Sequence, residues 1–307
     1  MTKAADALLE GLIDYAGLFP PAGEDMRRAL ENYASYALGP DRRALGRFIV
    51  PIARLSELEE EGNDLMPRGK RPKPWRISVL VAEDLAGAVD EIARFNRGHG
   101  PASRKGRAQI DVVELKATTP DEIGRQRTDL SRKLTAYVEI PLSGDIPALV
   151  GALAKTGLRA KVRTGGVTDD AFPAAEKIAD FIVACAAQRT PFKATAGLHH
   201  PVCGEYRLTY EPDAARTHMF GFLNVFVAAA LVYAGEGEDT CVAVLKENAP
   251  SAFTFNDDAI AWRDKRLTTG QIAAARSEFA IAFGSCSFRE PVDELAILTR
   301  TARATNK

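Results

Sequence analysis

The chain contains 307 residues, of which 40 are basic and 41 acidic, and its formal net charge is −1. Nucleic-acid and membrane surfaces favour proteins with an excess of Lys and Arg, so this balance argues against both partners and favours a small molecule. The four cysteines show no CxxC pairing, and the amino-terminal segment lacks the basic start and apolar core of a signal peptide. Together these features predict a cytoplasmic protein with reduced thiols.

Strand and helix patterns alternate through the first half of the chain. A strand within 12–23 is stopped by Pro20 and Pro21, and further strands are predicted at 46–53, 75–82, 110–117 and 134–142. Helices are predicted at 4–10, 24–38, 55–62 and 84–96, from Pro120 onward, and at 146–155. The basic segment 68–74 and the polar segment 97–107, which carries His99, are interpreted as surface loops.

The stretch 158–200 repeats this pattern with a lysine in each strand. RAKVRTGG, at 159–166, and PFKATAGLHH, at 191–200, each have the pattern of a strand that ends in a glycine turn, and the segment 172–188 between them has helical apolar spacing. Side chains alternate along a strand, so Lys161 and Lys193 face the same kind of surface. We expect a parallel βαβ unit here.

A long insert at 198–277 separates the second lysine strand from the next convincing strand, at 278–283. Within the insert we expect a loop at 199–218, helices at 221–235 and 239–248, a hairpin across 256–258 and a helix at 268–276. A final helix begins at Pro291. The whole pattern predicts a single (β/α)8 TIM barrel over 1–307, a fold that typically takes about 250 residues. An open doubly wound sheet is the alternative, although no GxGxxG or GxxxxGK[ST] loop follows a strand.

The apolar run at 221–235 is shorter than the roughly 20 residues that a membrane helix needs, and it contains Asn224. It therefore predicts either a buried helix or an interface helix. The second interpretation would make the protein a homo-oligomer through this helix.

Charged side chains gather near the predicted carboxyl ends of the barrel strands, where barrel enzymes place their active sites. Charged residues are rarely buried without partners, so they form either a structural ring of ion pairs or a site that binds an anion, moves protons or forms an amine adduct. A lysine held among other cations loses its proton near neutral pH and becomes a nucleophile towards carbonyls. On the inward faces we expect Lys116, Lys161, Arg163, Lys193, Glu114 and Glu139.

The two lysine strands also carry a resemblance to a known family. Lys-x-x-Thr-Gly at 161–165, followed one βα unit later by Lys-Ala-Thr-x-Gly at 193–197, resembles strands six and seven of class I (Schiff-base) aldolases of the deoxyribose-phosphate aldolase type. The similarity covers about 45 residues and rests on short motifs. It implies that Lys161 forms the Schiff base and that Lys193 lowers the pKa of Lys161.

The same resemblance implies that the glycine turns bind phosphate through backbone N–H groups. Two features depart from that family: Arg163 replaces a small residue and suits a carboxylate clamp, and the insert after Lys193 is foreign to it. The expected substrate contacts at these strands are Lys116, Arg163, Thr164, Gly165, Gly166, Thr195 and Gly197.

Three of the four histidines follow the second lysine strand. His199, His200 and His218, with Cys203, offer ligands for a divalent metal such as zinc, although no HxH or HExxH spacing supports this alternative. The interpretation that we favour needs no cofactor. In it, His199 acts as a general acid or base above Lys193.

The segment GSCS, at 284–287, leads into the final helix. Small residues before a helix N-terminus expose backbone N–H groups to a phosphate or carboxylate, so Ser285 and Ser287 are expected to bind substrate; the alternative is an N-cap by Ser287. Cys286 is not favoured as a nucleophile, because no histidine lies near it in the sequence. The sequence leaves the faces of Asp14 and Tyr15 unresolved.

These features favour a lyase or isomerase with aldolase-like chemistry. Its substrate would be a small anionic carbonyl compound, phosphorylated or not, and it would act through Lys161 and Lys193 with Glu114 or Glu139 moving protons. One alternative is a metal-dependent hydrolase or lyase that uses His199 or His200 with His218. The other is a non-catalytic binding or scaffold protein whose interface is the helix at 221–235.

Overall fold

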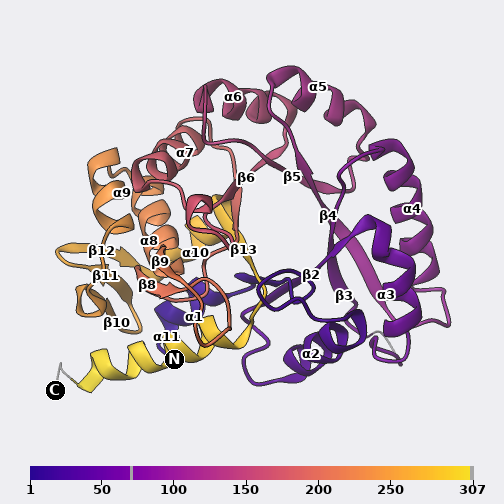
Figure 1. The fold of residues 1–307 in the computed structure, drawn as a ribbon, viewed down its shortest axis with the longest axis horizontal. Helices are drawn as coiled ribbons and strands as arrows, with labels where there is room; N and C mark the ends of the chain where they lie inside the picture. The colour runs from indigo at the N-terminus through magenta and orange to yellow at the C-terminus, as the bar shows by residue number, and fades with distance from the viewer. Residues whose placement is uncertain (70–71, 305–307) are drawn as a thin grey trace.

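The computed structural model describes residues 1–69 and 72–304, so part of the predicted loop at 68–74 lies outside the described residues. At its centre is a closed barrel of eight parallel strands, in the order β1-β13-β7-β6-β5-β4-β3-β2 (Figure 1). This confirms the predicted (β/α)8 barrel. The strands are β1 Ile13–Tyr15, β2 Leu45–Pro51, β3 Trp75–Leu80, β4 Ala108–Lys116, β5 Thr135–Glu139, β6 Arg159–Arg163, β7 Phe192–Thr195 and β13 Ala280–Ser285.

Helices surround the barrel (Figure 1). Local sequence sets their ends: Thr119 and Glu122 form a capping box at the start of α5, and Gly157, at φ 68°, ends α6. The helices outside the insert are α1 Lys3–Leu9, α2 Met26–Leu38, α3 Leu55–Gly62, α4 Leu85–Gly98, α5 Pro120–Asp129, α6 Ile146–Thr156, α7 Ala175–Ala187 and α11 Arg289–Ala304, with short 3-10 helices η1 Ile52–Arg54 and η2 Asp169–Ala171.

The insert between β7 and β13 is more ordered than the sequence suggests. The predicted loop at 199–218 is wrong, because β8 Gly204–Arg207 and β9 Arg216–Met219 pair there as an antiparallel hairpin. The predicted hairpin across 256–258 is confirmed and extends to a third strand. The remaining elements of the insert are α8 Phe222–Tyr233, α9 Glu238–Leu245, η3 Pro250–Ala252, β10 Phe253–Phe255, β11 Ala259–Trp262, β12 Lys265–Thr268 and α10 Thr269–Glu278.

The apolar helix α8 is part of the core of the chain. Its residues from Phe222 to Val232 are all buried, and Phe222 stacks on Phe283 of the barrel strand β13. Asn224, the polar residue in this run, donates two hydrogen bonds to the backbone carbonyls of Val244 and Glu247, at the end of α9, and so is satisfied inside the protein. The interpretation of this run as a buried helix is therefore confirmed, and its buried residues offer no surface to an oligomer or scaffold partner. Within the described residues, no helix combines the length and apolar character needed to cross a membrane.

His99 is buried, which corrects its interpretation as a surface-loop residue. It ends α4, where its ring stacks on Phe95 with centroids 4.4 Å apart. Its Nδ1 lies 2.7 Å from the carbonyl of Gly106, and its Nε2 lies 3.2 Å from Glu59. The histidine therefore stabilises the loop after α4.

Candidate functional site

Lys161 and Lys193 lie directly beside each other, because the parallel register of β6 and β7 pairs them. Both side chains are buried, with 3% and 0% of their surface exposed. Glu114 of β4 contacts both: its Oε2 is 2.8 Å from Lys161 Nζ, and its Oε1 is 2.7 Å from Lys193 Nζ. The predicted inward faces of these strands therefore meet inside the barrel.

Each lysine also contacts a second carboxylate of its own. Asp14, from β1, lies 2.6 Å from Lys193 Nζ, and Glu139, from β5, lies 3.0 Å from Lys161 Nζ. The hydroxyl of Ser78 donates a hydrogen bond to Glu114 at 2.7 Å. Asp14, whose face the sequence left open, thus points inward. The result is a chain of alternating charges that runs from the buried Asp14 to Glu139 at the mouth, here called the lysine network.

Burial and pairing act in opposite directions within the lysine network. Burial alone would raise the pKa of Glu114, but Lys161 and Lys193 outweigh it and hold that pKa far below its usual range. Burial would likewise lower the pKa of Lys193, but Asp14 and Glu114 outweigh it and raise that pKa above its usual value. Lys193 is therefore a permanent ammonium at neutral pH, 5.6 Å from the ring centre of Tyr137.

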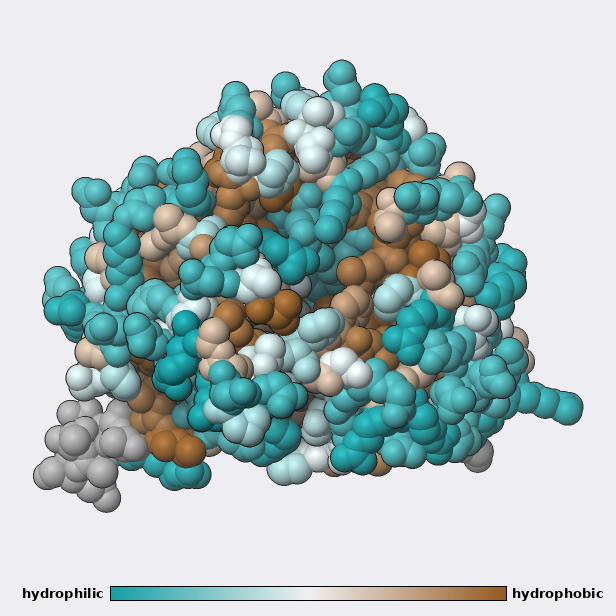
Figure 2. All heavy atoms as spheres, in the orientation of Figure 1, coloured by the Kyte–Doolittle hydropathy of each residue, from teal (hydrophilic) through white to brown (hydrophobic). Residues whose placement is uncertain are grey.

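The outer end of the lysine network reaches the barrel mouth. Glu139 lies 3.3 Å from Arg163 and 3.8 Å from Lys116, whose side chain is 73% exposed. These three residues line a cavity of about 360 Å³ above β4, β5 and β6. The middle of the face in Figure 2 is hollowed and carries hydrophilic atoms. Lys161, the partner of Glu139, is thus the lysine nearer to solvent.

The residues of the predicted glycine turns lie at the same end of the barrel. Thr164 is fully buried, and its hydroxyl donates to the carbonyl of Ala196 at 2.6 Å, which ties the ends of β6 and β7 together. Gly197 has a φ of +76°, a backbone conformation that residues with a side chain rarely adopt. A Cβ added there would also lie 3.0 Å from the Cα of Gly165. Gly166 and Gly197 line a second cavity at the mouth, of about 320 Å³. Thr195, the last residue of β7, pairs with Gly284 of β13.

The histidines after β7 do not meet at one centre. His199 Nδ1 is 2.9 Å from Glu290, His200 Nδ1 is 2.9 Å from Glu294, and His218 Nε2 is 2.9 Å from Cys203. In the part of the chain that the structure describes, no group of three or more His, Cys, Asp or Glu side chains is arranged to hold a metal ion. The metal site proposed on His199, His200 and His218 is therefore wrong. Adjacent residues on an extended segment point apart, which separates His199 from His200.

The segment 284–287 places Cys286 beside a histidine that is distant in sequence. Cys286 Sγ lies 3.8 Å from His199 Nε2, across 87 positions of the chain. The predicted capping role of Ser287 is confirmed, because its hydroxyl accepts the backbone N–H of Glu290 at 3.2 Å. Ser285 is buried at the end of β13, where its hydroxyl accepts the N–H of Ser287. Both serine hydroxyls are thus occupied by backbone groups of this turn.

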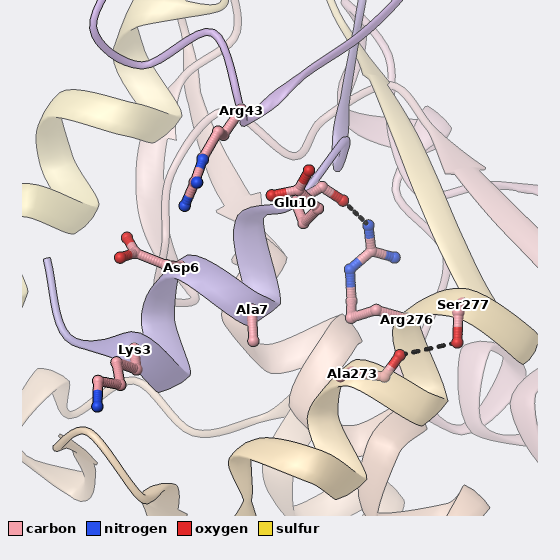
Figure 3. Close-up of a pocket in the computed structure, with 8 residues that line it drawn as sticks. All are labelled: Lys3, Asp6, Ala7, Glu10, Arg43, Ala273, Arg276 and Ser277. Atoms are coloured by element: carbon pink, nitrogen blue, oxygen red, sulfur yellow. Dashed lines mark hydrogen bonds between the residues drawn. The ribbon is translucent and has the colours of Figure 1, made fainter.

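Other cavities open at the opposite, amino-terminal end of the barrel. Figure 3 shows one of about 420 Å³ between α1 and α10, where Arg276 donates to the backbone carbonyl of Glu10. A larger one, of about 960 Å³, is lined by the first residues of β2, β3, β5 and β6. Barrel enzymes place their chemistry at the carboxyl ends of the strands, which is where the lysine network reaches the surface.

A scan against protein-family models found no match, and searches of curated proteins and of solved structures found none either. The function is therefore inferred from the site itself.

Proposed function

We propose that the protein is an aldolase-like lyase or isomerase of small anionic carbonyl compounds, and that Lys161 is the amine that attacks the carbonyl. One observation carries the proposal: two adjacent lysines share a single carboxylate, with Glu114 2.8 Å from Lys161 and 2.7 Å from Lys193. Like charges side by side on neighbouring strands are unfavourable, so this arrangement has a structural cost that a catalytic role explains. It also agrees with the resemblance to Schiff-base aldolases at these two strands.

The two lysines are suited to different roles. Lys193 is fully buried between Asp14 and Glu114, and its raised pKa keeps it charged. Lys161 is linked through Glu139 to the cavity at the mouth. A substrate that enters this cavity therefore meets Lys161 before Lys193. On this ground we assign the attack on the carbonyl to Lys161, and to Lys193 the role of a fixed positive charge beside it.

Glu139 is the candidate proton carrier. Its Oε2 lies 3.0 Å from Lys161 Nζ, yet this buried oxygen accepts no hydrogen bond of good geometry from the described residues. Burial would raise the pKa of Glu139, but Lys161 and Arg163 outweigh it and lower that pKa. A substrate anion that drew Arg163 and Lys116 towards itself would weaken this effect and make Glu139 a stronger base.

The chemical step balances without a cofactor. Lys161 gives one ammonium proton to Glu139, and its neutral nitrogen then forms a bond to the carbonyl carbon. Glu139 passes that proton, and then a second nitrogen proton, to the carbonyl oxygen, which leaves as water while the nitrogen keeps one proton as the iminium. The resulting iminium withdraws electrons from the neighbouring carbon, so that a C–C bond is broken or a C–H proton is lost there. Arg163 and Lys116, at the rim, would bind the carboxylate or phosphate of the substrate.

Borohydride trapping tests the proposal. The protein is incubated with pyruvate, glycolaldehyde phosphate and glyceraldehyde 3-phosphate in turn, reduced with borohydride and analysed by peptide mass spectrometry. We expect a reducible adduct on Lys161. The Lys161→Arg variant keeps the positive charge between Glu114 and Glu139 but cannot form an imine, so it should lose the adduct while remaining folded.

A matched control is Lys193→Arg, which also keeps its charge and should retain the adduct on Lys161. An adduct that persists in Lys161→Arg would show that another amine of the protein forms the imine. If none of these carbonyl compounds, and no other small anionic aldehyde or ketone, leaves a reducible mass on Lys161, the lysine network is a structural ion-pair cluster and the proposal fails.

A further inference from the structure

A second reactive arrangement lies at the barrel mouth, outside the lysine network. Cys286 Sγ is 3.8 Å from His199 Nε2, and His199 Nδ1 is 2.9 Å from Glu290 Oε2. Tyr210, from the loop of the β8–β9 hairpin, lies over this group, with its hydroxyl 3.7 Å from Cys286 Sγ and 3.0 Å from Glu290. The order of thiol, imidazole and carboxylate is that of a cysteine nucleophile with a base and a group that orients the base.

The other cysteines provide a contrast within the same molecule. Cys185 and Cys241 are fully buried, and burial raises the pKa of each thiol, that of Cys241 to about 12. Cys203 lies against His218, but burial raises its pKa to about 11. Buried thiols of this kind are inert. Cys286 is also buried, at 6% exposed, but its histidine is backed by a carboxylate, and the neighbours of the thiol, His199 and Tyr210, line a cavity.

Cys286 faces a histidine that is held in its charged form. Burial would lower the pKa of His199, but its contacts with Cys286 and Glu290 outweigh burial and raise that pKa to about 10. His199 is thus an imidazolium at neutral pH, with one N–H towards sulfur and the other towards Glu290. Cys286 also precedes the N-terminus of α11, whose dipole favours negative charge there.

The cavity beside the thiol is lined by two arginines of the β8–β9 hairpin. It measures about 320 Å³, and its lining includes His199, Tyr210, Arg207, Arg216 and Glu290, whose carboxylate faces His199. Arg207 and Arg216 are directly opposite each other in the β8–β9 ladder, an arrangement that is destabilising for like charges. Both arginines are exposed. A small carboxylate between them would relieve this repulsion and place the rest of the molecule towards Cys286.

We propose that Cys286 is a second nucleophile, which reacts with a small carboxylic acid that carries an aldehyde or ketone, bound by Arg207 and Arg216. The sulfur forms a bond to the carbonyl carbon, the C=O π electrons move to oxygen, and that oxygen takes the proton from His199. The product is a reversible hemithioacetal or hemithioketal, and no further reactant is consumed. The site goes beyond the proposed function and does not depend on Lys161.

Carboxymethylation measures this reactivity directly. Iodoacetate and iodoacetamide each form a carbon–sulfur bond and release iodide, and they differ in the carboxylate that the arginines would bind. At pH 6.5 we expect iodoacetate to modify Cys286 at least about tenfold faster than Cys203 in the same molecules, as peptide mass spectrometry would show. Iodoacetate should also react faster than iodoacetamide, and glyoxylate should protect Cys286.

Two kinds of variant separate activation from binding. His199→Asn should slow both reagents by about tenfold or more, because it removes the cation beside the sulfur. Arg207→Gln with Arg216→Gln should abolish the preference for iodoacetate and leave the iodoacetamide rate unchanged. Arg266→Gln, an exposed arginine on β12, should change neither rate.

The proposal is overturned if Cys286 reacts no faster than Cys203, or if His199→Asn reacts like the unaltered protein. Loss of the Lys161 adduct in the trapping experiment would leave these rates unchanged, so the two proposals fail separately. A reactive Cys286 without preference for iodoacetate, and without protection by glyoxylate, would disprove the arginine-bound carboxylate.

Discussion

Two polar clusters lie at the carboxyl ends of the barrel strands, and they differ in how much water reaches them. The lysine network is inside the barrel, where Lys193 and Glu114 are 0% and 3% exposed. The Cys286–His199–Glu290 cluster lies at the mouth, in contact with Tyr210 of the β8–β9 loop and beside the start of α11. In the lysine network, ion pairing has to offset the loss of hydration of every charge. In the Cys286–His199–Glu290 cluster, water still hydrates part of the charged groups. Matched substitutions in the two clusters should therefore have unequal effects on stability.

The largest expected difference is between two glutamate-to-glutamine variants. Glu114→Gln removes the acid that Lys161 and Lys193 share and leaves two buried ammoniums underpaired, which should cost about 3–5 kcal/mol of unfolding free energy. Glu290→Gln, whose side chain is 31% exposed, should cost about 1 kcal/mol or less. Urea unfolding at pH 7 measures both. Equal losses would mean that the interior charges are solvated.

Acid should weaken the interior cluster. The pKa of Glu114 is lower in the folded protein than in the unfolded chain, so its contribution is fully present above the unfolded value of about 4.3 and is lost as the pH falls further. The difference in stability between the unaltered protein and Glu114→Gln should be constant from pH 7 to pH 5 and should shrink below about pH 4. Urea unfolding of both proteins across this pH range measures the difference. A difference that grew towards pH 4 would contradict a lowered pKa of Glu114.

The stability contribution of the Cys286–His199–Glu290 cluster should fall as the pH rises. The pKa of His199 is raised to about 10, so its contribution is complete below the unfolded value of about 6.5 and declines as the pH rises towards 10. The stability advantage of the unaltered protein over His199→Asn should fall by at least about 1 kcal/mol between pH 6.5 and pH 9.5. His200→Asn serves as a control beside it. A stability advantage that stays constant over this pH range would show that His199 is not an imidazolium in the folded protein.

The smallest effect is expected at the rim of the lysine network. The side chain of Lys116 is 73% exposed and lies 3.8 Å from Glu139, so Lys116→Met should change the unfolding free energy by less than about 0.5 kcal/mol. The same variant should weaken substrate binding, seen as a raised KM, if the rim holds the substrate anion. A loss of stability comparable to that of Glu114→Gln would make Lys116 part of the buried network.

The barrel and the lysine pair were predictable because both depend on local periodicity. Strand alternation places Lys161 and Lys193 on one face, and parallel pairing of consecutive βα units makes them neighbours. The contact between Cys286 and His199 was not predictable, since it joins the ends of two different strands across the long insert. The β8–β9 hairpin escaped detection because its strands are short and polar, so they give no alternating apolar signal.

Side-chain partners explain the remaining differences. The polar segment around His99 has a loop composition, but stacking on Phe95 and contacts with Gly106 and Glu59 bury the ring. The clustering of His199, His200 and His218 in sequence suggested a shared metal ion, but each histidine contacts a different side chain. Asp14 lies in a strand of three residues, too short for alternation to indicate a face. Composition and spacing do not encode contacts of this kind.

The β8–β9 hairpin divides labour between two parts of the chain. The barrel strands carry the lysines, and the segments directly after β7 and β13 carry His199 and Cys286, whereas the hairpin and its loop supply Arg207, Arg216 and Tyr210. Substitutions in this hairpin would change which carboxylic acid binds without changing the buried charges of the lysine network. A chain with a different hairpin would thus keep the same reactive residues and bind a different ligand.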